Sequence, residues 1–290
     1  MTSFSVVAIV KEPLEIVQRF LRWYIGQGAS NITLFFDDPH DPAISFASGF
    51  ANVTAVSCTP AFWSEVGVKH DARFTRRQNN VLTYAYYRQT DDWMLNVDAD
   101  ELMYFHGESI ADRINSFDLD ASAYAIRTAE HVLVPASQGF HFRTGIEKSA
   151  VRDVFGANAD LFLRRRGLAG HPEGKSFIRT GLADIRLRQH WAEYRDGGAV
   201  EGPVLTASDA AFLLHFMVED YASWRGKLDW RVNSWGYPQP IKDRVAHIRA
   251  NSADIETDLK ALYQTLHELP PEKLEKYTAA GGIHRFALDI

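Results

Sequence analysis

Apolar runs alternate with amphipathic segments along the first hundred residues of the chain. The run from Phe4 to Val10 is almost entirely apolar and rich in valine, which is typical of a strand buried on both faces. Pro13 suits the first turn of a helix, and apolar residues follow it at helical spacing until Gly26 and Gly28. This pattern predicts a strand followed by a helix that ends at the two glycines.

The alternation continues through three further apolar runs. Strands are expected at residues 31–36, 52–58 and 93–97, and a helix is expected from Asp71 to about Thr90. Repeated strand–helix–strand units imply right-handed crossovers between parallel strands. The first part of the chain therefore predicts an α/β fold with a mainly parallel sheet and flanking helices.

The second half of the chain has a weaker pattern. Residues 124–127 and 155–163 are expected to form strands, and apolar residues at helical spacing from Pro240 onward predict helices. We therefore expect an α/β domain over residues 1–239 and a helical C-terminal extension over residues 240–290. The extension either packs on the first domain or forms the contact of a homodimer.

Composition narrows the classes of function. The 290 residues are 46% hydrophobic and 23% charged, which is ordinary for a globular protein. A net charge of −6 argues against a surface that coats nucleic acid. The single cysteine, Cys58, excludes an internal disulfide and fits a reducing compartment. The sequence has neither a basic-then-apolar leader nor an apolar run of the roughly 20 residues that span a bilayer, so we expect a cytoplasmic protein without a transmembrane segment.

Three carboxylates follow the last of these predicted strands. Asp98 and Asp100 are two residues apart, and side chains at that spacing in an extended chain share one face. Two oxygen ligands at a strand end suit a hard divalent cation, Mg²⁺ or Mn²⁺, that also holds a substrate's phosphates. A solvated acidic turn is the alternative, but the apolar run in front of the pair favours a metal site.

Polar clusters also follow the first two predicted strands. Lys11 and Glu12 come after the first strand, and Asp37 and Asp38 come after the second. Open α/β sheets bind ligands outside the carboxyl ends of their strands, so all three clusters are expected at one edge. Asp and Pro also favour turns, which is the alternative for the second cluster. Three clusters at one edge favour a binding site.

Four segments carry a resemblance to a known family. They are residues 7–12, 20–24, 28–32 and 96–101. Together they resemble family-2-like glycosyltransferases over about residues 5–105, with a departure at Lys11-Glu12-Pro13, where the family has an asparagine between lysine and glutamate. The resemblance implies a GT-A-like fold, a nucleotide-diphosphate-sugar donor, with a UDP-sugar favoured, and an unidentified saccharide or other hydroxyl acceptor.

The resemblance also implies roles for single residues. Asp98 and Asp100 would bind the cation that bridges the donor diphosphate, while the acidic residues after the first two strands would lie near uracil and ribose. Arg77 lies in the first turns of a helix, where arginine forks suit phosphate and a solvated face is the alternative. Gln78 matches a family glutamine that faces the nucleotide. The residues expected to bind the nucleotide sugar are Lys11, Glu12, Asp37, Asp38, Arg77, Gln78, Asp98, Lys175 and Lys227.

Lys175 and Lys227 enter that set through short motifs. Gly174-Lys175-Ser176 does not have the spacing of a P-loop, but in the family a motif of this kind opens a strand beside the active site. Lys227 follows aromatic residues, as a family lysine does, and could meet the leaving diphosphate. A surface lysine is the alternative for Lys227.

Histidines and further carboxylates are needed to complete the expected site. His190 and His215 each follow a strand-like segment, and one of them is expected as a third metal ligand, although a hydrogen-bonded core histidine is the alternative for each. Imidazole suits Mn²⁺ better than Mg²⁺. An inverting transferase needs a carboxylate base, and the sequence does not choose between Glu130 and Asp153. The aromatic side chains that could stack on a sugar, with a place in the core as the alternative for each, are Trp191, Trp224, Trp230 and Trp235.

Two other classes of function share these features. A nucleotidyltransferase that makes NDP-sugars has a similar sheet and metal carboxylates, but a glycine-rich basic loop is expected after its first strand, and Lys11-Glu12-Pro13 is not one. A non-catalytic module that binds nucleotides or sugars would keep the pocket without an acceptor base. The interpretation that the sequence favours is a metal-dependent glycosyltransferase.

Overall fold

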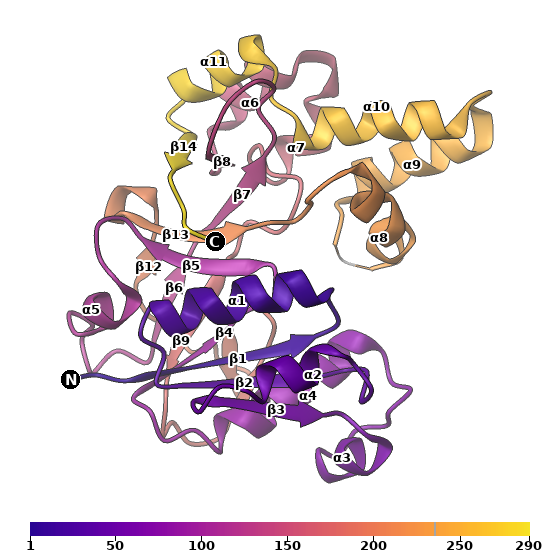
Figure 1. Cartoon of the computed structure of the whole chain (residues 1–290). Helices are drawn as coiled ribbons and strands as arrows, with labels where there is room; N and C mark the ends of the chain where they lie inside the picture. The colour runs from indigo at the N-terminus through magenta and orange to yellow at the C-terminus, as the bar shows by residue number, and fades with distance from the viewer. Residues whose placement is uncertain (235) are drawn as a thin grey trace. The chain divides into compact units, whose positions relative to one another are not determined.

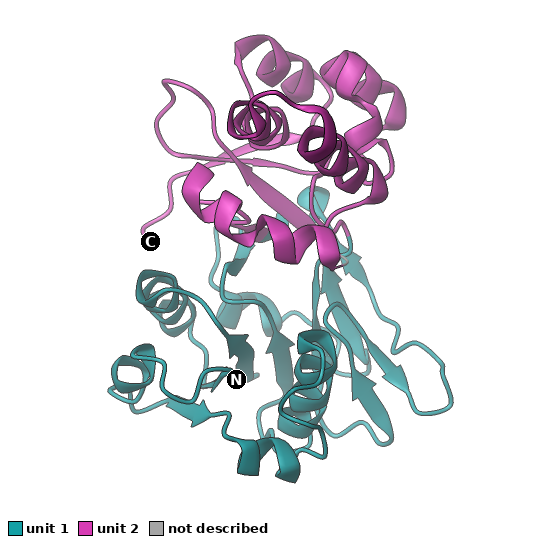
Figure 2. Cartoon of the chain, turned by 90° about the vertical axis from the view of Figure 1, so that its right-hand side faces the viewer, with its two compact units in different colours: residues 1–127, 173–213, 290 teal, residues 128–172, 214–289 magenta. Residues whose placement is uncertain are grey.

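The chain divides into two compact units. The structure is a computed structural model that describes residues 1–234 and 236–290, so Trp235 lies outside the described residues. Unit 1 comprises residues 1–127, 173–213 and 290, and unit 2 comprises residues 128–172 and 214–289 (Figure 2). Contacts therefore divide the chain elsewhere than at residue 240. The division into a domain over residues 1–239 and an extension over residues 240–290 stays a prediction.

Unit 1 is built on a mixed, mainly parallel sheet (Figure 1). Within the described residues the sheet has seven strands in the order β12–β6–β9–β4–β1–β2–β3. The pairs β4–β1, β1–β2, β2–β3 and β12–β6 are parallel, whereas β9 runs antiparallel to both of its neighbours. The strands are β1 (Phe4–Val10), β2 (Asn31–Phe36), β3 (Val53–Ser57), β4 (Trp93–Asn96), β6 (Ala123–Ile126), β9 (Lys175–Arg179) and β12 (Val204–Leu205). The predicted α/β class with a mainly parallel sheet is confirmed.

Helices flank this sheet, as expected. Every residue of β1 is buried, in keeping with a strand covered on both faces, and α4 contacts β1 while α2 contacts β3. The helix expected to start at Asp71 starts three residues later, at Phe74, and ends at Tyr86 rather than near Thr90. The helices of unit 1 are α1 (Leu14–Gly26), α2 (Ala43–Ala47), α3 (Pro60–Glu65), α4 (Phe74–Tyr86) and α5 (Ile110–Ile114).

Shorter strands complete unit 1. β5 (Glu101–Phe105) follows β4 after a four-residue turn and is a neighbour of β13 (Ala211–His215). β10 (Ile185–Leu187) and β11 (Ala192–Tyr194) form an antiparallel pair whose connecting loop carries residues 188–191. This loop contributes to the candidate site described below.

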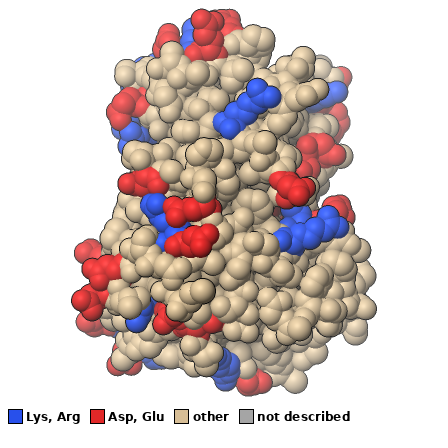
Figure 3. Space-filling model, turned by 60° about the vertical axis from the view of Figure 1, so that its left-hand side comes forward, with Lys and Arg blue, Asp and Glu red and all other residues tan. Residues whose placement is uncertain are grey.

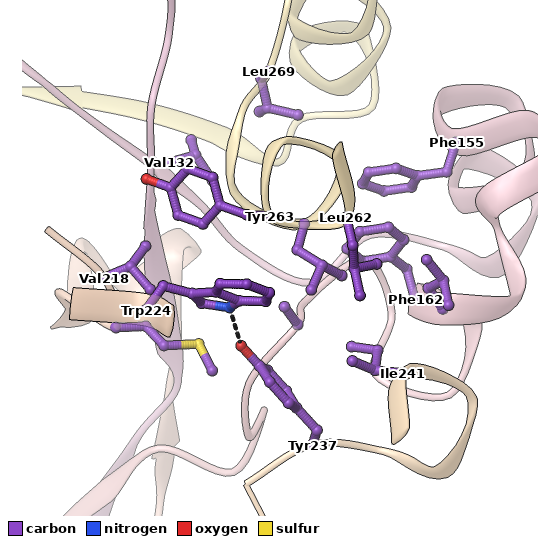
Figure 4. Close-up of a cluster of buried hydrophobic side chains, with 14 of the residues drawn as sticks. Val132, Phe155, Phe162, Val218, Trp224, Tyr237, Ile241, Leu262, Tyr263 and Leu269 are labelled. Atoms are coloured by element: carbon purple, nitrogen blue, oxygen red, sulfur yellow. Dashed lines mark hydrogen bonds between the residues drawn. The ribbon is translucent and has the colours of Figure 1, made fainter. Parts of the chain in front are cut away.

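Unit 2 combines an antiparallel sheet with helices. β14 (Ile283–Phe286) pairs with β8 (Phe140–Arg143), and β8 pairs with β7 (Thr128–Val132). Its core includes Trp224, whose ring nitrogen donates a 2.7 Å hydrogen bond to the hydroxyl of Tyr237 (Figure 4). The helices are α6 (Lys148–Phe155), α7 (Asp160–Leu163), α8 (Tyr221–Asn233), α9 (Gln239–Asn251), α10 (Ile255–His267) and α11 (Pro271–Ala279). The helices predicted after residue 240 are confirmed.

The strand expected at residues 155–163 is wrong. This segment contains the end of α6, a 3₁₀ turn at Gly156–Asn158 and α7. Phe155, Ala159 and Phe162 are buried at helical spacing, and the rings of Phe155 and Phe162 stack with centroids 3.8 Å apart. The period of the apolar residues is therefore helical, although their density resembles that of a strand.

The length of the helices and the distribution of surface charge concern the kinds of partner that the chain could have. No helix in the part of the chain that the structure describes has the length and apolar character needed to cross a membrane. On the face shown in Figure 3, acidic and basic side chains are interspersed among uncharged ones.

Candidate functional site

The carboxyl ends of β1, β2 and β4 lie at one edge of the unit 1 sheet. The parallel register places Val10 beside Phe36 and Val7 beside Asn96. The amide of Asp37 continues this pairing with a 3.0 Å hydrogen bond to the carbonyl of Val10. The polar clusters after these three strands therefore start from one edge, which is where ligands of open α/β sheets bind.

A closed turn carries the acidic cluster after β4. The amide of Glu101 donates to the carbonyl of Asp98 at 3.0 Å. In return, the Oε2 atom of Glu101 accepts a 2.9 Å hydrogen bond from the amide of Asp98. Glu101 is buried, so its side chain fixes the backbone of the turn from below the surface. The turn presents Asp98 and Asp100, both only partly buried, at the edge.

Lys175 is the partner of this turn. Its Nζ atom donates to Oδ2 of Asp98 at 2.8 Å and lies 3.3 Å from Oε2 of Glu101. The Lys175 side chain is 1% exposed, whereas that of Asp98 is 38% exposed. The ammonium thus lies behind the carboxylate, on the side away from solvent.

Strand pairing and a glycine bring Lys175 to this place. β9 runs antiparallel to β4 with Phe177 opposite Leu95, so Lys175 lies level with the residues that follow β4. Gly174 precedes it with φ +76°, and a Cβ atom there would lie 1.8 Å from the carbonyl oxygen of Ile126. A side chain at position 174 is therefore excluded both by conformation and by space.

The charges of this group reinforce one another. Burial raises the pKa of the Asp98 carboxyl, as does the neighbouring Asp100, but the positive charges of Lys175 and His190 outweigh both and hold it below its usual value. Burial lowers the pKa of Lys175, but Asp98 and Glu101 more than reverse this, so that the Lys175 pKa lies above its ordinary value. Asp98 is consequently a carboxylate and Lys175 an ammonium near neutral pH.

Gln78 holds the other oxygen of Asp98. From α4, its Nε2 atom donates to Oδ1 of Asp98 at 2.8 Å. Its own carbonyl oxygen accepts a hydrogen bond from the side chain of Gln189, in the loop after β10. Asn96 donates to the backbone carbonyl of Gln189 at 3.0 Å. The 188–191 loop is thus tied both to α4 and to the end of β4.

His190 lies in this loop and is the histidine next to Asp98. Its charge lowers the pKa of Asp98, and its Nδ1 atom lies 2.9 Å from the carbonyl oxygen of Gly174. A carbonyl can only accept, so Nδ1 carries the proton and the lone pair of the neutral ring is on Nε2. This is the arrangement in which histidines bind metals, with the second nitrogen bonded to a carbonyl or carboxylate.

The second cluster at the edge contains an ion pair. Arg77 from α4 donates to Oδ2 of Asp37 at 2.9 Å, and its second terminal nitrogen lies 2.5 Å from Oδ1. The guanidinium also lies 5.3 Å from the centroid of the Trp63 ring. Asp38 is exposed, and its side chain accepts a 2.9 Å hydrogen bond from the amide of His40, as in a local turn.

The expected base Glu130 lies in unit 2 as part of a buried ion pair. Its side chain is 1% exposed, and its Oε2 atom accepts from Arg143 at 2.8 and 3.0 Å and from the amide of Ala169 at 2.9 Å. Oε1 accepts from the amide of Gly170. Burial raises the pKa of Glu130, but Arg143 outweighs burial and the net pKa is lowered. These contacts are those of a structural ion pair.

The other candidates of unit 2 are spread over different elements. Asp153 is exposed on α6, and Lys227 is half-buried on α8. His215 ends β13, and its charge lowers the pKa of Glu130. The roles predicted for these residues stay predictions. Among the tryptophans, Trp224 belongs to the core, whereas Trp191 and Trp230 are exposed.

The remaining candidates after β1 lie at the edge itself. Lys11 is exposed and Glu12 is half-buried, directly before α1. Sequence reasoning missed Gln189 and the bonding role of Glu101. The position of Glu101 beside the aspartate pair was a usable signal for it, whereas only the fold brings Gln189 to Gln78.

The residues at the edge fit a cation that needs a substrate to complete its ligands. Across residues 1–234 and 236–290, no group of three or more His, Cys, Asp and Glu side chains is placed to hold a metal ion. Mg²⁺ in particular binds through one or two carboxylates plus substrate phosphates and water. Asp98 and Asp100 supply two carboxylates next to open solvent, which fits such a cation.

Comparisons with known proteins add little to this geometry. No family model matches the chain, and no curated protein matches it. A Bacillus anthracis structure described as that of a glucose-1-phosphate thymidylyltransferase in complex with sucrose aligns with 96% of this chain and 94% of its own, at 10% identity and a TM-score of 0.32. A likeness this low carries no argument about fold or function.

Proposed function

We propose that this chain is a glycosyltransferase that takes a sugar from a nucleotide-diphosphate donor, with a UDP-sugar favoured, and transfers it to a hydroxyl acceptor. One observation carries the proposal. Asp98 and Asp100 follow β4 at the carboxyl edge of a mainly parallel sheet, and a buried ammonium, Lys175, lies 2.8 Å from Asp98. Carboxylates for a cation and a fixed positive charge at one place suit the diphosphate of such a donor.

A divalent cation would be held by Asp98 and Asp100, with His190 favoured over His215 as a further ligand. When bound, the cation supplies charge neutralisation for the diphosphate that leaves the sugar. Lys175 adds a positive charge from the protein side. A positive charge held close to the diphosphate stabilises the negative charge that develops there.

The rest of the edge would bind the nucleoside. Asp37, held by Arg77, has carboxylate oxygens that can accept from a nucleobase N–H or a ribose hydroxyl. Gln78 orients Asp98 and so acts on the diphosphate end. The acceptor base stays undecided between Glu130 and Asp153, although the buried ion pair of Glu130 favours the exposed Asp153.

The test is a donor screen with matched readouts. We expect UDP to raise the melting temperature weakly alone and more strongly with Mn²⁺ or Mg²⁺, because diphosphate and cation complete each other's contacts. We expect slow release of UDP from UDP-sugars that EDTA abolishes. UDP affinity that is unchanged by EDTA would contradict a site built on Asp98 and Asp100.

The same screen separates the alternatives. Formation of pyrophosphate from a nucleoside triphosphate and a sugar 1-phosphate would identify a nucleotidyltransferase instead. Tight binding of UDP-sugar without hydrolysis or transfer to any acceptor would favour a binding module. The direct passage from β1 to α1 through Lys11-Glu12-Pro13, rather than through a glycine-rich loop, favours the transferase.

A further inference from the structure

Both oxygens of Asp98 already accept hydrogen bonds, one of them from the charged side chain of Lys175. Its ammonium donates to Oδ2 at 2.8 Å, while the neutral amide of Gln78 donates to Oδ1 at 2.8 Å. An ammonium and a divalent cation on the same carboxylate repel each other strongly in a partly buried place. In the nucleotide-free protein, Lys175 therefore competes with the cation for Asp98.

Glu101 offers Lys175 a second partner. Its Oε2 atom lies 3.3 Å from Nζ, and the side chain is buried beneath the turn. A buried ammonium that lost its only carboxylate would be strongly destabilised. With Glu101 in place, Lys175 can weaken its bond to Asp98 and remain paired.

We propose that Lys175 is a positioning residue that makes the cation and the diphosphate bind as a pair. Without nucleotide, it stays on Asp98 and weakens cation binding. When diphosphate arrives, its negative charge offsets the repulsion between Lys175 and the cation, Asp98 turns towards the cation, and Glu101 keeps the lysine paired. This inference rests on the proposed function and concerns the order in which the two ligands can be held.

The consequence is a reciprocal coupling between the binding of the cation and the binding of the diphosphate. If Lys175 opposes the cation alone and its charge attracts the diphosphate, then removing it raises cation affinity in the free protein and lowers diphosphate affinity with the cation present. A lysine that only stabilised the fold would change neither affinity in this opposed way. The opposite signs of the two changes distinguish the proposal from a structural role.

The experiment measures Mn²⁺ binding by electron paramagnetic resonance and UDP binding by calorimetry, on the full chain. For Lys175→Met we expect Mn²⁺ alone to bind at least about fivefold more tightly than in wild type, the lower end of typical couplings. UDP in the presence of Mn²⁺ should bind at least about fivefold more weakly. Lys69→Met removes the same charge from an exposed position of unit 1 and should leave both affinities unchanged.

Two further variants keep the test decisive if Lys175→Met does not fold. Lys175→Arg retains the charge and should keep the weak binding of Mn²⁺ alone. Glu101→Gln removes the second carboxylate, holds Lys175 on Asp98 and should weaken the joint binding of Mn²⁺ and UDP. Wild-type affinity for that joint binding in Glu101→Gln would overturn the proposal.

The outcomes separate this inference from the function on which it rests. If wild type binds UDP with Mn²⁺ but Lys175→Met binds Mn²⁺ alone no more tightly than wild type, only the role of Lys175 is overturned. If wild type binds UDP neither with nor without Mn²⁺, the proposed function fails and the inference fails with it.

Discussion

Lys175, which opens β9, donates a 2.8 Å hydrogen bond to Asp98, which follows the end of β4. The two residues are 77 positions apart in the chain, and the antiparallel pairing of their strands makes them neighbours. Because the lysine is buried and the aspartate is partly exposed, the pair is a fixed charge arrangement at the edge of the sheet. It differs in this from a surface ion pair, which contributes little and varies in geometry.

Substitutions of Asp98 should affect both stability and ligand binding. Asp98→Ala leaves Lys175 with Glu101 alone, and we expect a loss of about 1–3 kcal/mol, less than for a fully buried pair because Asp98 is partly exposed. Asp98→Asn keeps an acceptor for the ammonium and should lose less. Both variants should lose Mn²⁺-dependent binding of UDP, as should Asp100→Ala. Thermal melts and calorimetry check these outcomes, and near-full transferase activity in any of the three would contradict the metal assignment.

The two histidines should respond differently. His190 lies close enough to Asp98 to shift its pKa and has Nδ1 bonded to a backbone carbonyl, whereas His215 lies close enough to Glu130 to shift its pKa. We expect His190→Ala to weaken Mn²⁺-dependent UDP binding and His215→Ala to leave it unchanged. Titrations of UDP at fixed Mn²⁺ measure this. The reverse result would assign the metal to His215, and no change in either variant would leave the cation with oxygen ligands only.

Gly174 and Gly181 provide a matched pair of glycine substitutions. Both have positive φ, +76° and +80°. A Cβ atom added at Gly174 would lie 1.8 Å from its nearest neighbouring atom, whereas one added at Gly181 would meet no described atom within 4 Å. Gly181→Ala should therefore show the conformational cost alone, about 1 kcal/mol. Gly174→Ala should be clearly less stable and should also lose affinity for UDP with Mn²⁺, because Lys175 follows directly. Equal melting temperatures for the two variants would show that the backbone near Ile126 can yield.

The Glu130–Arg143 pair should make stability depend on pH. Burial raises the pKa of Glu130, but Arg143 outweighs it, so the folded-state pKa lies below the ordinary value of 4.5. A carboxyl with a depressed folded-state pKa adds stability above its unfolded pKa, and this contribution is lost as pH falls through the folded-state pKa. Glu130→Gln should therefore cost about 3–5 kcal/mol at neutral pH, and its difference from wild type should shrink as pH falls below about 4.5.

The exposed Asp153 provides the control for the pH-dependent stability of Glu130→Gln. Asp153→Asn should change stability by no more than about 0.5 kcal/mol at any of these pH values, as is usual for surface positions. Loss of turnover in Asp153→Asn at unchanged stability would identify it as the base. Loss of turnover in a folded Glu130→Gln, with Asp153→Asn active, would instead assign the base to Glu130.

The sequence was sufficient for the strands whose pattern is local. β1, β2 and β4 are short apolar runs bounded by turn residues, and parallel strands end at one edge of their sheet, so the placement of Asp98 at that edge could be predicted. Residues 155–163 could not be assigned correctly from apolar density, because the stacking of Phe155 on Phe162 depends on the helical turn between them. The partners of the charged residues could not be predicted in the same way.

Long-range contacts set the charge pattern of the site. The contact between Lys175 and Asp98 depends on the antiparallel register of β9 with β4. The contact between Gln189 and Gln78 joins residues that are 111 positions apart in the chain. Glu130 stays a candidate base, but its partner Arg143 lies on a paired strand that the sequence did not predict. The sequence was sufficient to propose residues for the site, but not to predict which residues they contact.

The peptide at Gly174 connects two groups that lie next to Asp98. Its carbonyl oxygen holds the ring of His190, and its α-carbon leads directly into Lys175. A small rotation of this one peptide would move the imidazole and the ammonium together relative to Asp98. The close packing of this peptide against the carbonyl oxygen of Ile126 therefore helps to place both groups at once, so a change there would be felt by His190 and Lys175 together.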